Sequence, residues 1–474
     1  MRSRSIAALL VAVALAGCAI GPKYRRPALP TPDTFRDAAA DPASIADLPW
    51  FDVFRDDALA PLVREALAAN RDLQLAASRV EQSRDFAAVA RSELFPRVGY
   101  EADVARGRAT TLGSPSFLRE TGNSVLGVLN AAWELDVWGR IRRSTEAARA
   151  EMLASEAFRR GVVLSLVTGV AQAWFELREL DRELEIAQES VRAYDETHAL
   201  FLRQFQGGVV SRLDSLRAEG SLAQAASQVP AIEQAIVAKE NEISVLLGRP
   251  AAPIERDVAA PASSVPPEIP AGLPAQLIER RPDLVQAEEN LVAANAQVGV
   301  ALAGFLPRIG LTSFWGSASL DLSSFLESGT GLWSAAAQGI GPILTFGQTW
   351  YVWEASKANA DAARFAYEGT VLVALADVSN ALTARTKLAA IRSEKERAVT
   401  ALREAVRISR VRYVGGLSSY LEVLDALQQL YPAEYELART ERDELLAVVS
   451  LYRALGGGWN QYPGPPSIPL PLRP

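Results

Sequence analysis

The hydrophobic residues of this chain follow two different periods, which predict long helices interrupted by a few strands. In residues 129–137 apolar side chains fall on every second position with acids between them, which is the period of a β-strand. Residues 97–104 alternate in the same way. In residues 59–67, by contrast, apolar residues recur at i, i+3, i+4, i+7 and i+8, a spacing typical of an amphipathic helix. We therefore expect a mainly helical protein with isolated strands.

An internal duplication organises the sequence. "RDLQLAASRVEQ" with "LFPRVG" recurs as "RPDLVQAEENLVAAN" with "FLPRIG" at an offset of 211 residues, and later segments recur at an offset of 208. The expected organisation is a signal peptide (1–17), an extended segment (18–55), a first repeat (56–248), a Pro-rich linker (249–272), a second repeat (273–456) and a Pro-rich tail (457–474).

Each repeat predicts two strands followed by two helical rods. The strands are expected at about 97–109, 124–138, 308–320 and 331–346, and the rods at 139–247 and 347–455. No loop signal interrupts residues 139–205, so one continuous helix there would be about 100 Å long, too long for a globular domain. Pro230 and Pro432 lie inside the return rods, where each predicts a kink or a break.

"FQGGVVSRLD" and "YVGGLSSYLE" predict the turns that connect the rods. The glycines suit the left-handed backbone conformation that ends a helix, and a serine in each turn suits the N-cap position of the next helix. Ser419 with Glu422 fits a capping box, and Ser211 with Asp214 is a shorter variant. The alternative, a phosphate-binding glycine loop, requires a strand before it and a lysine after it, and neither of these two turns has them.

The first residues, "MRSRSIAALLVAVALAGC", have the layout of a secretory signal that ends in a lipobox. Cleavage would leave Cys18 as an acylated N-terminus. The alternative is a free cysteine in an ordinary signal peptide, but Cys18 is the only cysteine in the chain. By analogy with bacterial lipoprotein sorting, Ala19 favours the outer membrane as the destination.

After residue 18 the sequence contains no apolar run of the length that a membrane helix needs. A membrane-spanning part must then be a closed barrel of strands. Four strands cannot close a barrel, whereas three copies would supply twelve. In this interpretation one face of the strands meets lipid through Tyr100, Trp133, Leu135 and Val137, and the acids of the other face line an aqueous lumen: Glu101, Asp103, Glu134 and Asp136.

Composition and charge exclude several other functions. A net charge of −7 without a basic patch argues against nucleic acid as a partner. The sole histidine, His198, and the single cysteine leave no ligand cluster for a transition metal, and we expect no cofactor. Glu134 and Asp136 would share one wet face, so their pKa values would not be separated as acid–base catalysis requires. We therefore expect no enzyme.

"AAWELDVWGR", "LFPRVG" with "FLPRIG", "RRPDL" at 280–284 and "YRALGGGW" at 452–459 resemble the TolC/OprM-type outer membrane factors, in particular the NodT-like lipoprotein branch. The resemblance covers essentially the whole mature chain. It implies a homotrimer in the outer membrane, with a twelve-stranded barrel continued by a long α-helical barrel through the periplasm. It also implies a passive exit duct for an inner-membrane pump, of the proton-driven RND type, joined through a periplasmic adaptor protein.

The resemblance also assigns roles to residues. It makes Leu421 and Asp425 the periplasmic gate, and it makes the two turns the tips that contact the adaptor: Gly207, Gly208, Val209, Ser211, Gly415, Gly416, Leu417 and Ser419. The cargo stays open among drugs, metals, lipids and proteins. Two other functions are the alternatives: a structural coiled-coil lipoprotein of the envelope, which leaves the strands without a role, and a periplasmic adaptor or solute-binding lipoprotein, which needs a globular domain or a cleft.

Overall fold

The computed structural model of the chain describes residues 19–29, 32, 34, 35, 44, 45, 48, 50–54, 56–107, 122–257 and 274–457. Cys18, the segment before it, most of the predicted linker and nearly all of the predicted tail lie outside these residues. The chain divides into two units. The strand unit is Met1–Ala28, Ser78–Glu156 and Gln286–Glu368, and the helical unit is Leu29–Ala77, Ala157–Val285 and Gly369–Pro474.

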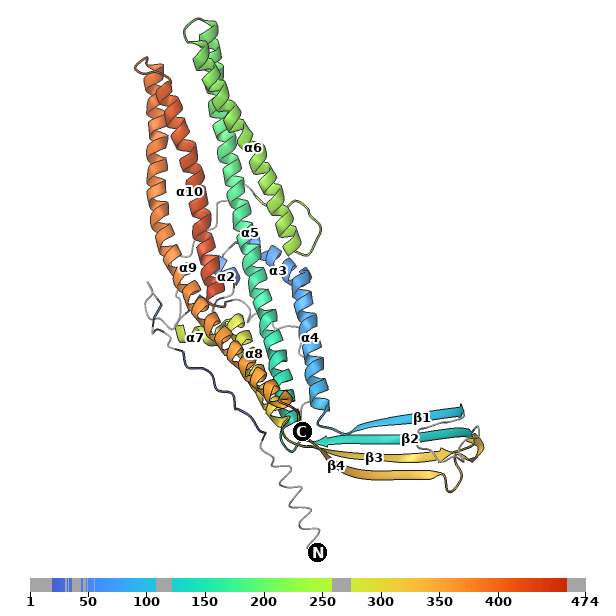
Figure 1. The fold of residues 1–474 in the computed structure, drawn as a ribbon. Helices are drawn as coiled ribbons and strands as arrows, with labels where there is room; N and C mark the ends of the chain where they lie inside the picture. The colour runs from blue at the N-terminus through green and yellow to red at the C-terminus, as the bar shows by residue number, and fades with distance from the viewer. Residues whose placement is uncertain are drawn as a thin grey trace. The chain divides into compact units, whose positions relative to one another are not determined.

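Long helices make up most of the described chain. Their bounds are α4 (Arg71–Ser92), α5 (Arg140–Gln206), α6 (Arg212–Leu246), α8 (Pro282–Ala303), α9 (Gln348–Val414) and α10 (Leu421–Ala454), with the short helices α2 (Trp50–Phe54), α3 (Leu59–Ala69) and α7 (Pro274–Arg280). Helices α5 and α9 have 67 residues each, so each is about 100 Å long, as the missing loop signals predicted. In Figure 1, α5 with α6 and α9 with α10 form two antiparallel hairpins.

The four strands form one antiparallel sheet in the order β1-β2-β3-β4 (Figure 1). Their bounds are β1 (Arg97–Gly107), β2 (Gly122–Leu135), β3 (Arg308–Ser319) and β4 (Gly331–Ile340). The central pair, β2 with β3, joins the two repeats. In the described part of the chain β1 and β4 each pair on one side only, so the sheet has two open edges.

Two strands end earlier than their sequence pattern predicted. β2 ends at Leu135, not near residue 138, because the next residue, Asp136, meets the first turn of α5 and the chain then turns into that helix at Gly139, which has a positive φ of 79°. β4 ends at Ile340, not near residue 346. Pro342 follows two residues later and has no N–H to donate to a strand ladder, which explains the early end.

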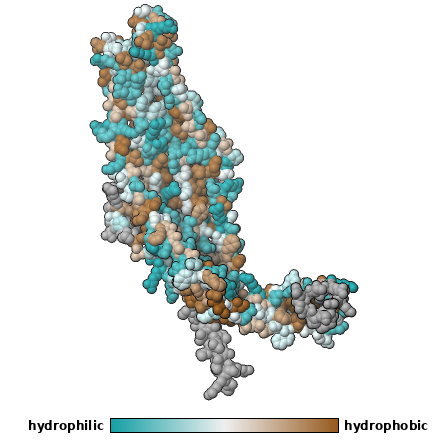
Figure 2. Space-filling view, in the orientation of Figure 1, coloured by the Kyte–Doolittle hydropathy of each residue, from teal (hydrophilic) through white to brown (hydrophobic). Residues whose placement is uncertain are grey.

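The core of the helical unit lies between its long helices. Helices α5, α6, α9 and α10 contribute a buried cluster: Ile186, Ala193, Tyr194, Ala225, Val399, Val406, Val423, Ala426, Leu427, Leu430, Tyr431 and Ala438. Pro230 and Pro432 do not break their helices, since α6 and α10 continue through them. Figure 2 shows brown hydrophobic patches on the outer surface of this unit as well as teal hydrophilic ones.

Both return helices end at a glycine that packs tightly on the other end of its repeat. Gly248 has φ of 73°, and a Cβ there would lie 2.3 Å from the carbonyl oxygen of Ala69. Gly456 also has φ of 73°, and a Cβ there would lie 3.1 Å from Cα of Arg281. Gly248 and Gly456 are 208 residues apart, so the duplication is kept in detail at these junctions.

Candidate functional site

The two faces of the sheet have different chemistry. The strand register places Tyr100 opposite Leu129, Leu129 opposite Trp315 and Trp315 opposite Trp333, a single row across all four strands. Their side chains are exposed or nearly so, as are Val98 and Val104 on the same face. We call this side the aromatic face. Its composition matches the outward surface of a strand that meets lipid.

The opposite side is the charged face. Glu101 and Asp103 lie on β1, and the register puts them on the same side as Asn130, Ala132 and Glu134 of β2. Arg97 and Arg308, at the first positions of β1 and β3, share this face. Three of the four acids predicted to share one face therefore do so.

Asp136 corrects that prediction. It lies one residue beyond the end of β2, and its carboxylate accepts hydrogen bonds from the backbone N–H groups of Ile141 (2.9 Å) and Arg142 (3.0 Å). The Arg142 guanidinium also donates to it at 3.0 Å. Asp136 thus caps the first turn of α5, because a carboxylate satisfies N–H groups that have no partner in the helix.

Glu134 is also engaged by a basic side chain. Arg140, the first residue of α5, donates to both of its carboxylate oxygens at 2.8 and 3.0 Å, and the same guanidinium lies 3.4 Å from Glu93. The hydrogen bond to Glu134 raises the pKa of Arg140 above its ordinary value. The strand pattern gave no sign of this pairing, although the basic run that opens α5 could have suggested it.

A strap formed by residues 19–28 runs antiparallel to α8. The Ile20 N–H donates to the Trp138 carbonyl at 3.1 Å, which holds the start of the strap beside the junction of β2 and α5. Further along, Asn295 of α8 donates to the Pro22 carbonyl at 3.0 Å, and Tyr24 and Arg26 both donate to Glu288. Ala19 is the first residue after Cys18, so the strap fixes the position from which the predicted anchor would leave.

The helical hairpins end in two turns with the same backbone. After α5, the N–H of Gly208 donates to the Phe205 carbonyl and that of Val209 to the Gln204 carbonyl, and Gly208 has φ of 72°. After α9, the equivalent bonds are made by the N–H groups of Gly416 and Leu417, and Gly416 has φ of 69°. Both are Schellman turns, in which glycine takes the left-handed position.

The two turns differ in how the next helix begins. Ser211 caps α6 and forms a complete capping box with Asp214, as its sequence predicted. The capping box predicted for Ser419 and Glu422 is not formed, because α10 begins at Leu421 and its N-cap residue is Tyr420. Tyr420 has helical φ and ψ, and its side chain makes no capping hydrogen bond.

The packing of Tyr420 explains that difference. Its ring meets Phe201 and Tyr413 edge to face, with centroids 4.8 and 4.9 Å away, and its hydroxyl contacts that of Thr197. These contacts hold Tyr420 where the sequence pattern placed an extended cap. The same aromatic cluster borders a cavity of about 690 Å³ between the two turns, to which Val209 and Leu421 also contribute.

Leu421 and Asp425 lie on one exposed face of α10, as predicted from their spacing. The Leu421 side chain is 62% exposed, and Asp425 accepts a hydrogen bond from Gln429 at 2.8 Å. The opposite face of the same turns, with Val423 and Leu427, is buried in the core. The two residues can therefore contact another molecule without leaving their own helix.

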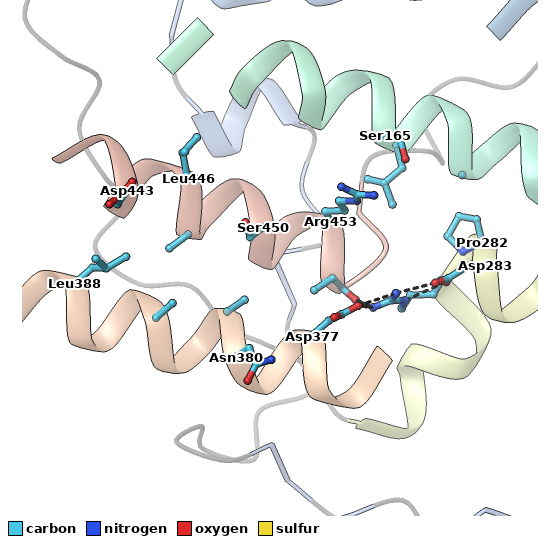
Figure 3. Close-up of a pocket in the computed structure, with 17 residues that line it drawn as sticks. Ser165, Pro282, Asp283, Asp377, Asn380, Leu388, Asp443, Leu446, Ser450 and Arg453 are labelled. Atoms are coloured by element: carbon cyan, nitrogen blue, oxygen red, sulfur yellow. Dashed lines mark hydrogen bonds and ion pairs between the residues drawn. The ribbon is translucent and has the colours of Figure 1, made fainter. Parts of the chain in front are cut away.

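A second cavity of about 690 Å³ lies among α5, α8, α9 and α10 (Figure 3). Arg281 borders it and is held by Asp283 at 2.7 Å, Asp377 at 3.2 Å and the carbonyl oxygen of Ala454 at 3.0 Å. Because two carboxylates neutralise this guanidinium, Arg281 acts as a structural link and is not available to bind an anion. The motif "RRPDL" contributes to the family resemblance, but its sequence alone does not predict this role.

The described ranges hold neither a metal-binding cluster nor a membrane-spanning helix. No group of three or more His, Cys, Asp or Glu residues in them is arranged to hold a metal ion. Among the same residues no helix combines the length and the hydropathy that crossing a bilayer requires.

Known proteins resemble this chain over most of its length. The profile of the family described as outer membrane efflux protein matches residues 62–249 and 273–457. The solvent efflux pump outer membrane protein SrpC of Pseudomonas putida is 35% identical over 459 residues, which cover 94% of this chain and 96% of SrpC. The cation efflux system protein CusC of Escherichia coli O6:H1 is 32% identical over 462 residues, 95% of this chain and 98% of CusC.

Solved structures give the same result for the fold. The outer-membrane channel OprN superposes with a TM-score of 0.85 at 31% identity, covering 93% of this chain and all (100%) of that one. The open state of the MtrE outer membrane channel of Neisseria gonorrhoeae superposes with a TM-score of 0.83 at 31% identity, covering 93% of this chain and 99% of that one. The predicted fold class, long helical rods with four strands per chain, is thereby confirmed.

Proposed function

This chain belongs to the outer membrane efflux protein family and is the outer-membrane exit duct of an efflux system, and we propose that three copies pool their strands to build that duct. The observation that carries the proposal is the sheet. One face is aromatic, the other is charged, and the two edge strands β1 and β4 each lack a second neighbour in the described part of the chain.

A trimer removes both open edges. β4 of one copy would pair with β1 of the next, and three four-stranded sheets would close into twelve strands with no unpaired backbone facing lipid. The aromatic face would meet the lipid and the charged face would meet water. A barrel of this size leaves an aqueous interior. The exposed apolar residues on the helices, among them Leu372, Val373 and Ile408, favour packing against other copies.

In this assembly Glu101, Asp103 and Glu134 would face the lumen, and the chain would move its cargo without catalysing a reaction. The energy for transport would come from an inner-membrane pump, connected by a periplasmic adaptor protein. The charge of Glu134 is already balanced by Arg140, so the lumen charge at the sheet would come chiefly from Glu101 and Asp103 of each copy.

We assign the adaptor contact to the two turns and the gate to Leu421 and Asp425. Val209 and Leu417 project from the turns with about three quarters of their surface exposed. The cavity between the turns is lined on one side by aromatic rings, and an apolar side chain of a partner could fill it. Leu421 and Asp425 are exposed on one helix face. In a threefold assembly each would converge with its two copies, giving an apolar ring and an acidic ring.

We further propose that the mature protein starts at acylated Cys18. The strap supports this, because it holds Ala19 beside the end of the sheet where β2 joins α5. That end would lie at the inner surface of the outer membrane, where a lipid anchor would insert. Mass spectrometry of the purified protein tests it: a diacylglyceryl-modified Cys18 is expected, and an unmodified N-terminus or an intact Met1 would contradict it.

The cargo is proposed to be small organic molecules such as drugs or solvents, as the name of SrpC indicates for that relative. CusC is named for cation efflux, and its sequence identity to this chain, 32%, is close to the 35% of SrpC. Metal cations are therefore the second candidate cargo. Deleting the gene and measuring growth in organic solvents, antibiotics and copper or silver salts distinguishes these two cargoes. Sensitivity to the metal salts alone would favour cations.

The duct itself is tested in two measurements on detergent-extracted protein. Native mass spectrometry should give three chains per particle, and reconstitution in planar bilayers should give ion-permeable pores. A stable monomer with an ordered sheet would exclude the shared barrel. A trimer that conducts no ions in any condition, including after substitution of the proposed gate, would exclude the duct.

A further inference from the structure

The segment Leu320–Thr330, which connects β3 to β4, folds back over the sheet, and we call it the flap. It contains a short 3₁₀ helix, Leu322–Ser324. Phe325 is its central contact: a Cβ placed on Gly127 of β2 would lie 2.6 Å from Cζ of the Phe325 ring. The ring therefore sits directly on the backbone of β2, in a place that only glycine leaves open.

The register identifies the face that the flap covers. Gly127 is paired with Ala102, two residues from Tyr100 on the same side of β1. The flap therefore lies over the aromatic face. Phe325 and Leu326 border a groove of about 360 Å³ together with Tyr100, Leu129 and Trp315.

The flap satisfies much of its polar backbone internally. Thr330 Oγ1 donates to the carbonyls of Phe325 (3.0 Å) and Glu327 (2.9 Å), and the Glu327 N–H donates to the Ser324 carbonyl at 3.0 Å. Asn123 of β2 donates to the Asp321 carboxylate at 3.3 Å. A segment with its polar groups occupied in this way can enter a less polar medium at a lower desolvation cost.

Its three leucines, in contrast, are largely exposed. Leu320, Leu322 and Leu326 are 74%, 70% and 89% exposed. Three large exposed leucines on one short connection form an apolar surface that continues the aromatic face. The acid Asp321 lies between two of them and Glu327 follows the third, so the connection carries both apolar and charged groups, as does an amphipathic segment at a membrane interface.

The length of the strands sets the depth of the flap. β3 has 12 residues, which at about 3.4 Å per residue span roughly 40 Å. With a tilt of about 45° this corresponds to a height of roughly 28 Å, close to the apolar band of about 25 Å in membrane barrels. The flap is at the opposite end of the strands from the β2–α5 junction, so it reaches the outer boundary of that band.

We propose that the flap is a lipid-embedded element of the outer leaflet, with Leu320, Leu322 and Leu326 among the acyl chains and Asp321 and Glu327 toward the head groups. The proposal rests on the proposed function, because it requires the aromatic face to meet lipid. It assigns the β3–β4 connection to the outside of the duct. The two other arrangements, a plug inside the lumen and a contact between copies, are outcomes of the test.

The test uses single cysteines, since Cys18 is the only one in the chain. Leu326→Cys reports on the flap, Trp333→Cys on the aromatic face of β4, and the adjacent Ser334→Cys on the opposite face. Each full-length trimer is labelled with an environment-sensitive fluorophore and placed in liposomes. Quenching is then measured with a nitroxide-bearing lipid and with aqueous iodide. The parent protein, labelled in parallel, measures any background from Cys18.

We expect labels at Leu326→Cys and Trp333→Cys to be quenched several-fold more by the nitroxide lipid than by iodide, and the label at Ser334→Cys to behave in the opposite way. A Leu326→Cys label quenched mainly by iodide, or by neither agent, overturns the lipid-embedded flap even when Trp333→Cys is in lipid. If labels at both Trp333→Cys and Ser334→Cys respond only to iodide, the proposed function itself fails. Leu322→Cys provides a second flap position should Leu326→Cys not form trimers.

Discussion

Asn70 and Arg281 hold equivalent positions in the two repeats, and each donates a hydrogen bond to the carbonyl near the end of its own return helix. Asn70 Nδ2 lies 2.9 Å from the Leu246 oxygen, and an Arg281 guanidinium nitrogen lies 3.0 Å from the Ala454 oxygen. The donors are 211 residues apart and the acceptors 208, which are the two offsets of the duplication. The same contact between the start of a repeat and the end of its return helix is thus made by asparagine in the first repeat and by arginine in the second.

The two joints should differ in how much their loss destabilises the fold. Arg281→Ala removes the hydrogen bonds of a buried guanidinium to Asp283, Asp377 and the Ala454 carbonyl, which costs on the order of 2–4 kcal/mol because the two carboxylates left behind are partly solvated. Asn70→Ala removes the bond to Leu246 and the cap of the Leu73 N–H, which together cost about 1–3 kcal/mol. Thermal unfolding of the detergent-extracted protein measures both.

Arg71→Ala is the matched control for these two substitutions. Arg71 is exposed and, within the described part of the chain, bonds to Gln74 on its own helix, so its loss should change the free energy of unfolding by less than about 0.5 kcal/mol. Equal melting temperatures for Arg281→Ala and Arg71→Ala would refute the structural role of the arginine joint.

The tip glycines should be needed for their backbone and not for their small size. A Cβ at Gly208 or Gly416 would meet nothing within 4 Å, yet both have positive φ. Valine at either position should therefore strain the turn by about 1–2 kcal/mol, and efflux with adaptor binding should fall while trimer formation persists. Gly220→Val, inside α6 with equally open surroundings, should be tolerated. Unimpaired adaptor binding by both tip variants would rule out the turns as the contact.

The gate should open when its two residues lose their side chains. Leu421→Ala with Asp425→Ala removes the proposed apolar and acidic rings, and since both side chains are exposed the fold should be unaffected. We expect raised conductance in planar bilayers and entry of large antibiotics without the pump. The equivalent pair of the first repeat, Leu213→Ala with Arg217→Ala, is the control and should conduct like the parent. A correctly trimeric gate variant with parental conductance would remove these residues from the gate.

Stability should fall with rising pH because of one buried carboxyl. Burial, followed by the nearby charge of Glu183, raises the pKa of Glu179 from its ordinary 4.5 to about 7, although Arg442 and Arg439 face it and act in the opposite direction. The folded protein therefore holds this proton more tightly than the unfolded chain. The stabilisation is complete below about pH 4.5 and is lost as the pH rises through 7.

Glu179→Gln makes this contribution insensitive to pH. The melting temperature of Glu179→Gln relative to the parent should increase between pH 5 and pH 8. Glu185→Gln, on an exposed side chain of the same helix, should show no such change. A constant difference between Glu179→Gln and the parent at both pH values would contradict the raised pKa.

The sequence predicted the elements better than it predicted their ends. The rods, the four strands and the two turns follow from periodicity and glycine, which act within a few residues. The end of β4 could have been read from Pro342. The end of β2 depends on how Asp136 meets the first turn of α5, and no alternation of apolar residues signals a cap formed from beyond the strand.

The pattern of apolar and polar residues along the chain could not predict contacts between segments that are far apart in the sequence. Glu134 was correctly placed on the charged face, but its pairing with Arg140 depends on the angle at which α5 leaves the sheet. Ser419 has the sequence of a capping residue, yet the packing of Tyr420 on Phe201 and Tyr413 decides the turn instead. Phe201 is 219 residues before Tyr420, so a local motif could not reveal that contact.

The unlike starts of α6 and α10 have a consequence for symmetry. A ring of three chains displays six hairpin ends, and identical ends would let a threefold partner dock in either of two positions 60° apart. Because one end is closed by a serine–aspartate cap and the other by aromatic rings packed edge to face, those two positions are chemically distinct. A partner that distinguishes the two ends therefore binds in one orientation about the threefold axis. Each of the three chains then makes the same contacts with the partner and is displaced in the same direction.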